Sequence, residues 1–265
     1  MSEENEFLKF LGINKEEMDK RAKFQRKKDG KGCVLCDYTG LLNSEKGSEF
    51  CSCVKNKMLR DIFIKANVPK IYLGKTMEDW NTRSDNAGND LGSQQSISER
   101  VYYLLKNYER VISKICAGHQ IKIKHSGNIS TFLHSLNFDG GIGSGKTFIS
   151  SVMVQAAIRE KLSAKYYDWS DILQIVTDYD KKDQLDEIVD DFKNLDFIAL
   201  DGVENYNYNH PQMAIHIDRI SRARLNSGKP IFIMSNGNVS SVVNGSGWPS
   251  LLRNCLTIRL PNAIR

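Results

Sequence analysis

The chain has 265 residues and a formal net charge of +5, with 26% charged and 40% hydrophobic residues. This composition is ordinary for a folded protein, and so small a net charge does not by itself indicate a nucleic-acid partner. The first residues carry no secretion signal and no segment approaches the roughly 20 apolar residues that cross a bilayer, so we expect a cytoplasmic protein with no membrane partner.

The first thirty residues are predicted to be helical and to end in a basic run. Such a run is typical of a solvated helix face, and contact with nucleic acid or an acidic partner surface is the alternative. The basic residues are Lys20, Arg21, Lys23, Arg26, Lys27, Lys28 and Lys31.

Four cysteines follow in two close pairs, Cys33-x-x-Cys36 and Cys51-x-Cys53. Four thiolates at these spacings suit the tetrahedral coordination of zinc, although the second pair is tighter than the usual C-x₂-C pattern. The alternative is a small core of reduced cysteines. A segment this short and polar has little apolar surface with which to fold unaided, and this favours a zinc site on all four cysteines.

The middle of the chain alternates between helical and polar segments. An apolar and basic helix is predicted over residues 54–66, whereas Asn81–Gln95 is poor in apolar residues and indicates a linker or exposed loop. A helix is expected to restart at Ser96, because Ser96-x-x-Glu99 matches a capping box. Its apolar face would be formed by Val101, Leu104, Leu105, Tyr108, Ile112 and Ile115.

From Thr131 onward, short β-rich segments alternate with helical ones. This alternation predicts an α/β fold with a parallel sheet covered on both faces. The predicted strands are Thr131–Asp139, Ala164–Asp168, Phe197–Asp201, Ile231–Ser235 and Leu256–Leu260. Cys116 and Cys255 lie among apolar residues and are expected in the core.

The segment from Gly140 to Thr147 matches every fixed position of the Walker A pattern G-x-x-x-x-G-K-[ST]. It lies between a predicted strand and a predicted helix, where backbone N–H groups and the helix dipole bind phosphate. Lys146 is expected on the β- and γ-phosphates of ATP, and Thr147 on Mg²⁺. A flexible glycine turn is the alternative. The remaining residues of the loop are Gly140, Gly141, Gly143, Ser144 and Gly145.

Two later strands end in side chains that suit ATP hydrolysis. Asp201 follows a hydrophobic strand, as a Walker B segment requires, and is expected to bind Mg²⁺ beside the Thr147 hydroxyl. Asn236 ends another buried strand and is expected to hold the attacking water near the γ-phosphate. A polar residue that ends a strand by chance is the alternative for both.

An arginine from a neighbouring subunit can stabilise the charge on a transferring phosphoryl group. Arg253, just before the last predicted strand, is the first candidate for this role. Arg224, on the helix before Pro230, is the second candidate. Surface arginines without such a role are common.

The order of these motifs resembles the AAA+ core of DnaC/DnaI-type replicative helicase loaders and their IstB relatives. In the ATPase part, the resemblance is carried by Gly140–Thr147, Ala199–Asp201, Pro230–Asn236 and Leu251–Arg253. Upstream, it extends to Cys33–Gly40, Phe50–Cys53, Ala66–Tyr72 and Thr76–Trp80, so that it covers most of the chain.

The resemblance implies a P-loop AAA+ core with a five-stranded parallel sheet, preceded by a small helical and zinc-binding domain. The sequence departs from the loader pattern after the Walker B aspartate, where Gly202 replaces the usual water-activating carboxylate and Glu204 lies two residues further on. We therefore expect weak ATPase activity. Since the chain stops at Arg265, just after the last predicted strand, we expect no C-terminal lid.

These features predict a loader that places a DnaB-type hexameric helicase on single-stranded DNA, with ATP, Mg²⁺ and Zn²⁺ as ligands. We expect a helicase-binding module over residues 1–66, a linker and entry segment over 67–95, and an ATPase core over 96–265 that self-associates. In related loaders the helix after the second strand helps to hold single-stranded DNA. Here that region is Trp169–Lys182, with Lys181 and Lys182 either on phosphates or on a solvated helix end.

Two other functions stay open. One is an IstB-like transposition ATPase on duplex DNA, which the zinc module disfavours. The other is a nucleotide-binding adaptor with little hydrolysis, which Gly202 favours. An origin in a phage or a mobile element is also left open.

Overall fold

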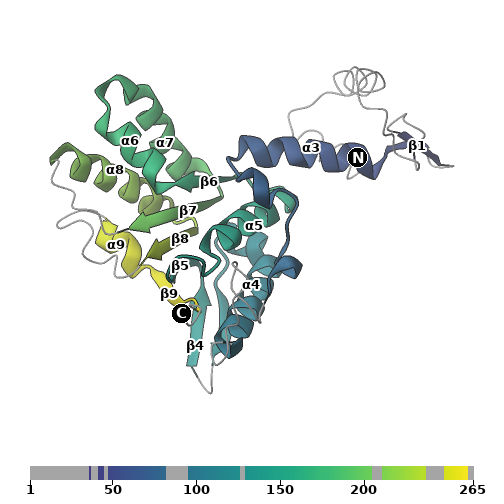
Figure 1. Cartoon of the computed structure of the whole chain (residues 1–265), viewed down its shortest axis with the longest axis horizontal. Coiled ribbons are helices and arrows are strands. Elements are labelled where there is room, and N and C mark those ends of the chain that lie inside the picture. The colour runs from purple at the N-terminus through teal and green to yellow at the C-terminus, as the bar shows by residue number, and fades with distance from the viewer. Residues whose placement is uncertain are drawn as a thin grey trace. The chain divides into compact units, whose positions relative to one another are not determined.

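The computed structural model describes residues 36, 41–44, 47–81, 95–125, 129–204, 211–236 and 248–261 (Figure 1). The chain divides into two compact units, Met1–Lys65 and Ala66–Arg265. The predicted N-terminal helix, its basic run and Cys33 lie outside the described residues, as does most of the polar Asn81–Gln95 segment. Among the described helices, none is long and apolar enough to cross a membrane.

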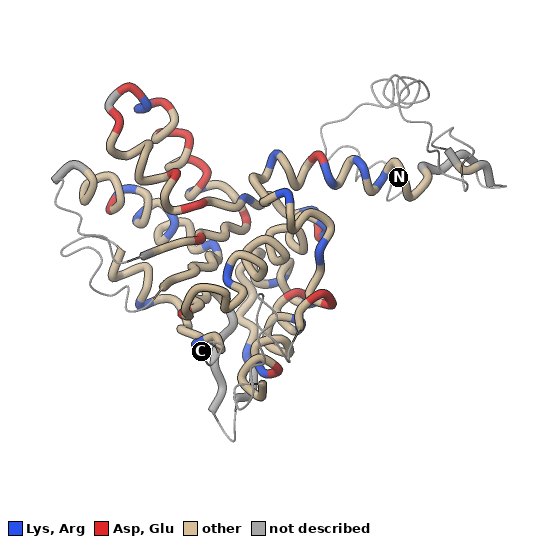
Figure 2. Tube along the Cα trace, in the orientation of Figure 1, with Lys and Arg blue, Asp and Glu red and all other residues tan. Residues whose placement is uncertain are grey.

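The first unit contains an antiparallel pair of strands followed by a helix. β1 (Leu41–Ser44) pairs with β2 (Gly47–Phe50), and α3 (Ser52–Lys65) begins two residues after the second strand. Basic residues outnumber acidic ones along α3, where the tube of Figure 2 is mostly blue among the charged positions. The charged residues of this helix are Lys55, Lys57, Arg60 and Lys65, against Asp61.

The second unit is built on a five-stranded parallel sheet, which confirms the predicted fold class. Its strand order is β6-β7-β8-β5-β9, so the strand that precedes the P-loop is flanked by two strands that come much later in the chain. The strands are β5 (Ser135–Asp139), β6 (Ala164–Asp168), β7 (Phe197–Glu204), β8 (Ile231–Asn236) and β9 (Cys255–Arg259).

Helices cover both faces of this sheet (Figure 1). One group lies on one face and consists of α4 (Gln95–Cys116) and α5 (Lys146–Arg159). The other face carries α6 (Trp169–Thr177), the short η4 (Tyr179–Lys181), α7 (Lys182–Asn194), α8 (Pro211–Ser227) and α9 (Trp248–Arg253).

Side chains alternate between these two layers, as the pleat of a strand requires. Ile198 and Leu200 of β7 belong to the core cluster formed with α6, α7 and α8. Phe197 points to the other layer, where its ring centroid lies 5.0 Å from that of Phe232. The ring centroid of Tyr108, on α4, lies 4.7 Å from that of Phe232. Because both faces are buried, the strands are nearly continuous apolar runs, and this made them predictable.

The predicted strand Thr131–Asp139 is wrong as a single element. β3 (Ile121–His125) and β4 (Ile129–Leu133) form an antiparallel pair outside the main sheet, and only β5 joins that sheet. The chain changes direction at His134, whose carbonyl accepts a hydrogen bond of 2.6 Å from Tyr108. An apolar run with one histidine gives no signal of such a break, because both halves have strand-like composition.

The start of α4 also differs from the prediction. The helix already includes Gln95, so Ser96 lies inside the helix and not at its N-cap; the Ser96 carbonyl accepts a hydrogen bond of 3.1 Å from the side-chain Nε of Arg100. The predicted capping box at Ser96 and Glu99 is therefore wrong; Gln95 instead donates to Glu99 at 2.9 Å. The predicted apolar face is confirmed, since Val101, Leu105, Tyr108, Ile112 and Ile115 are buried.

Candidate nucleotide-binding site and cysteine cluster

The P-loop leaves the carboxyl end of β5 and turns directly into α5. Gly143 and Gly145 have φ angles of 83° and 92°, in the left-handed region where only glycine is unstrained. Gly140 is also required, because a Cβ there would lie 2.7 Å from Ser144 Oγ and 2.9 Å from Leu260 Cβ. The sequence-predicted loop thus has the backbone that phosphate binding needs, with the first N–H groups of α5 behind it.

Lys146 lies at the first position of α5, and its side chain runs back along the loop. The Nζ atom donates to the carbonyls of Gly140 and Gly141 at 2.5 and 2.7 Å. The residue is only 8% exposed, so its ammonium group is held inside the loop. An ammonium group at this place suits the β- and γ-phosphates of a nucleotide.

Thr147 and Asp201 meet beside the P-loop, as the sequence predicted. The Thr147 side chain hydrogen-bonds to the Asp201 carboxylate. The carboxylate also accepts a hydrogen bond of 2.9 Å from the Tyr166 hydroxyl and one of 2.8 Å from the Gly202 N–H. Asp201 is 4% exposed, and burial raises the pKa of its carboxyl group, while these three hydrogen bonds oppose that rise. Hydroxyl and carboxylate oxygens are ligands that Mg²⁺ accepts, so this pair fits a magnesium site.

Residues 66–80 form a second wall next to the P-loop helix. Gln155 of α5 donates to the Tyr72 carbonyl at 2.8 Å and accepts from the Gly74 N–H at 2.7 Å, which fixes the turn after η1 (Lys70–Tyr72). The rings of Tyr72 and Trp80, which flank η2 (Met77–Asp79), lie 5.9 and 5.7 Å from the Phe148 ring.

Tyr72 belongs to a segment that carried the family resemblance, but no role beside the nucleotide site was predicted for it. Burial raises the pKa of its phenol, and the charge of Asp201 adds to that rise. Tyr166 was also missed. In the sequence, both tyrosines occupy ordinary hydrophobic positions. Only their contacts with distant residues distinguish them from other core tyrosines.

Two of the proposed catalytic residues end neighbouring strands. Glu204 and Asn236 are opposite each other in the register of β7 and β8. Asn236 is partly buried, and the side chain of Glu204 lies outside the described part of the structure. The roles of Asn236 in water positioning and of Glu204 as a replacement carboxylate stay predictions.

The two candidate arginines differ completely in their surroundings. Arg253 is exposed at the end of α9, with its Nε donating to the Pro249 carbonyl at 3.2 Å. Arg224 is 1% exposed, and its guanidinium group donates to four backbone carbonyls. These carbonyls belong to Phe192, Leu195, Asp196 and Pro230. A buried group with these partners cannot reach a neighbouring subunit, so Arg224 is excluded as the arginine finger.

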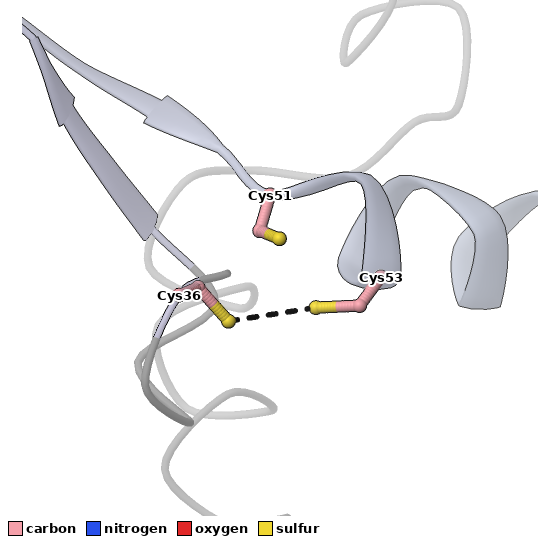
Figure 3. Close-up of side chains that lie close together, drawn as sticks. All are labelled: Cys36, Cys51 and Cys53. Carbon is pink, nitrogen blue, oxygen red and sulfur yellow. Dashed lines mark hydrogen bonds between the residues drawn. The ribbon is translucent and has the colours of Figure 1, made fainter. Parts of the chain in front are cut away.

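The cysteines of the first unit come together in space. Cys36, Cys51 and Cys53 place their sulfur atoms within 4.8 Å of one another, at the start of α3 (Figure 3). The sulfurs of Cys36 and Cys53 are 3.6 Å apart. Zinc–sulfur bonds of about 2.3 Å at tetrahedral angles place two sulfurs about 3.8 Å apart, so this donor set fits zinc. The fourth predicted ligand, Cys33, lies outside the described residues.

Comparison with solved structures finds similar folds among replication proteins. AMPPCP-bound DnaA from Aquifex aeolicus matches with a TM-score of 0.49 and 14% identity, over 73% of this chain and 51% of that one. The DnaC helicase loader matches with a TM-score of 0.48 and 13% identity, over 72% of this chain and 99% of that one. DnaI matches with a TM-score of 0.47 and 15% identity, over 75% of this chain and 97% of that one.

The chain thus spans about half the length of the DnaA structures that it matches. No family model matches the sequence, and no curated protein does. With TM-scores below 0.5 and identities below 25%, these matches concern the fold alone and assign no function to this chain.

Proposed function

We propose that the chain is an ATP-dependent loader of a DnaB-type hexameric replicative helicase onto single-stranded DNA. The observation that carries the nucleotide part is the contact of Thr147 with buried Asp201 beside a P-loop of correct backbone conformation. The motif order described in the sequence supports the loader part. The separate cysteine-bearing unit supports a second, partner-binding activity.

In this proposal the side chains around the P-loop bind the triphosphate and its metal. Lys146 exchanges its carbonyl partners for phosphate oxygens, and the N–H groups of the loop bind the same phosphates. Thr147 and Asp201 would hold Mg²⁺, and the bound ion would supply positive charge to the triphosphate. Asn236 positions water, and exposed Arg253 completes the site of a neighbouring copy.

The N-terminal unit is proposed to bind the helicase. Zinc on Cys33, Cys36, Cys51 and Cys53 would hold the start of α3 in place, because a unit this small has little hydrophobic core of its own. α3 is basic, so an acidic surface on the partner suits it.

The α6–α7 region does not support the two lysines suggested as DNA contacts. Lys181 pairs with Asp178 at 3.2 Å. Acidic residues outnumber basic ones in the segment, as the red parts of the tube in Figure 2 show, and they would repel phosphates. The acidic residues are Asp171, Asp178, Asp180, Asp183, Asp186, Glu187, Asp190 and Asp191. Single-stranded DNA stays a proposed partner without an assigned binding surface.

A nucleotide-binding adaptor with little hydrolysis is the second candidate. Gly202 favours it, since the position after Asp201 offers a backbone N–H but no side chain. Turnover separates these functions: a loader ATPase is expected to hydrolyse ATP and to respond to single-stranded DNA, whereas an adaptor binds ATP without either effect.

The experiment measures binding of a fluorescent ATP analogue with Mg²⁺, and then turnover with and without single-stranded DNA. The Lys146→Ala variant is expected to lose binding by about 10²-fold or more, because a charge-assisted contact to phosphate is lost. Lys193→Ala, at an exposed position near the end of α7, is the control and should bind normally. A wild-type protein that does not bind ATP would refute the proposal.

A further inference from the structure

Asp168 ends the strand next to the Walker B strand. In the register of β6 and β7 it is the direct partner of Asp201, so both carboxylates leave the carboxyl edge of the sheet side by side. Neighbouring strands are about 4.8 Å apart, which places Asp168 one strand away from the predicted Mg²⁺ ligand. The sequence predicts this strand end, but no local pattern gives Asp168 a role.

Gly202 occupies a distorted part of β7. The register between β7 and β8 shifts between Leu200 and Val203, and Gly202 lies within that irregularity with φ of +72°. A side chain at this position would be strained, because non-glycine residues rarely adopt such a φ. The backbone conformation at Gly202 therefore disfavours any side chain, including a carboxylate, at the position after Asp201.

The space beside Gly202 faces Asp168. A Cβ built on Gly202 would lie 3.8 Å from Asp168 Oδ1, and no other heavy atom outside the neighbouring residues comes within 4 Å. The Oδ1 atom of Asp168 thus borders the volume that a side chain at position 202 would enter. Burial is the main cause of the raised pKa values of Asp201 and Tyr166, and the charge of Asp168 adds a smaller rise to both.

The Asp168 side chain is held in position but keeps one oxygen for another partner. Its Oδ1 caps α6 by accepting from the Ser170 N–H at 2.8 Å and from the Ser170 hydroxyl at 2.6 Å. Within the described part of the chain, no donor is bonded to Oδ2. The residue is partly exposed, so water can reach it.

We propose that Asp168 replaces the water-activating carboxylate that Gly202 cannot supply. This inference rests on the proposed ATPase function. Asp168 Oδ2 accepts a hydrogen bond from the attacking water. The water oxygen forms a bond to the γ-phosphorus while the bond from that phosphorus to the β,γ-bridging oxygen breaks, and its electron pair stays on ADP. The water proton passes to Asp168 and from there to the released phosphate.

The test compares Asp168→Asn with the wild type and with Asp178→Asn. Asparagine is a good N-cap, so α6 should be retained. Asp178 is a matched control, because it also caps a helical turn by accepting from the Asp180 N–H at 3.1 Å. Removal of a general base costs about 10²-fold or more in turnover. ATP affinity should change less than about threefold, since Asp168 contacts water rather than phosphate.

A second readout identifies the nucleotide that stays bound. Each protein is incubated with ATP and Mg²⁺, freed of excess nucleotide, and its ATP and ADP are separated by chromatography. Asp168→Asn should retain ATP, whereas the wild type and Asp178→Asn should carry ADP. If Asp168→Asn does not fold, Asp168→Ser keeps a capping hydroxyl without the carboxylate and takes its place.

The outcomes separate this inference from the proposed function. Equal turnover of wild type and Asp168→Asn would overturn the role of Asp168 and leave the ATPase intact. A wild type that binds ATP but shows no turnover, even with single-stranded DNA, would overturn the proposed ATPase, and with it the role of Asp168, in favour of the adaptor. Absence of ATP binding in the wild type would overturn both.

Discussion

The hydroxyl of Tyr166 donates a hydrogen bond to the carboxylate of Asp201, with 2.9 Å between the two oxygens. The bond crosses from β6 to β7 and is buried. It fixes one carboxylate oxygen of the predicted Mg²⁺ ligand from a side chain outside both Walker motifs. Burial raises the pKa of Asp201, and Tyr166 is one of the donors that oppose the rise.

Tyr166→Phe should therefore raise the pKa of Asp201 further. Protons and Mg²⁺ compete for the carboxylate, so the pH below which Mg²⁺-dependent ATP binding is lost should move upward. At acidic pH we expect affinity to fall several-fold relative to the wild type, with less effect at alkaline pH. The measurement is ATP-analogue binding with Mg²⁺ across a pH series.

Tyr167→Phe is the matched control for this series. Tyr167 is the next residue on β6, and its hydroxyl donates to Asp191 of α7 on the opposite layer. Its loss should lower stability without shifting the pH dependence of binding. Identical pH curves for Tyr166→Phe and the wild type would contradict the role assigned to Tyr166.

Arg253→Ala should keep ATP affinity but lose most of its turnover, because the exposed guanidinium group is proposed to act on the nucleotide of a neighbouring copy. An arginine finger contributes about 10³-fold or more to turnover. Mixing Arg253→Ala with Lys146→Ala subunits should restore part of the activity, since one subunit supplies the arginine and the other an intact P-loop. A mixture as inactive as its components would argue against action between subunits.

Arg224→Met should unfold more readily than the wild type, by about 3 kcal/mol, because four backbone carbonyls lose a buried charged donor. Arg222→Ala is the control on the same helix. Arg222 is exposed and pairs with Asp218 one turn away, so its loss should cost less than about 0.5 kcal/mol. Urea denaturation of both variants measures the difference, and equal midpoints would contradict the structural role.

The cysteines should divide into two classes on chemical modification. Burial raises the pKa values of Cys116 and Cys255 to about 12, so their reactive thiolate fraction at pH 8 is only about 10⁻⁴. One zinc per chain is expected on Cys33, Cys36, Cys51 and Cys53. Iodoacetamide should label these four only after chelation of the metal.

Native-state labelling followed by mass spectrometry checks this division, together with metal analysis of the purified protein. Cys53→Ser should lose zinc and retain ATP binding, whereas Cys116→Ser should retain both. A folded wild-type protein without zinc, or equal labelling with and without chelator, would contradict the zinc site.

Local sequence patterns were sufficient for much of the fold. The P-loop, β6 and the apolar face of α4 were predictable because glycine conformations, buried parallel strands and helical periodicity have clear signatures. The meeting of Thr147 and Asp201 followed from the rule that functional side chains gather at the carboxyl edge of a parallel sheet.

The remaining features depend on contacts between distant parts of the chain. Arg224 has the sequence appearance of a surface arginine, yet backbone carbonyls from α7 and the following loop enclose it. Asp168 looks like an ordinary helix cap, and only its register with Asp201 and its proximity to Gly202 give it a catalytic setting. No local pattern encodes such pairings, because they arise from the strand order of the sheet.

In the proposed function ATP binding drives helicase loading, and a loading assay measures that step itself. Single-stranded DNA coated with single-strand-binding protein is incubated with the cognate DnaB-type helicase and this protein, and unwinding of a downstream duplex is measured. We predict stimulation with ATP by the wild type and by Lys193→Ala, and none by Lys146→Ala. Equal unwinding with and without the protein, or equal stimulation by Lys146→Ala, would contradict an ATP-dependent loader.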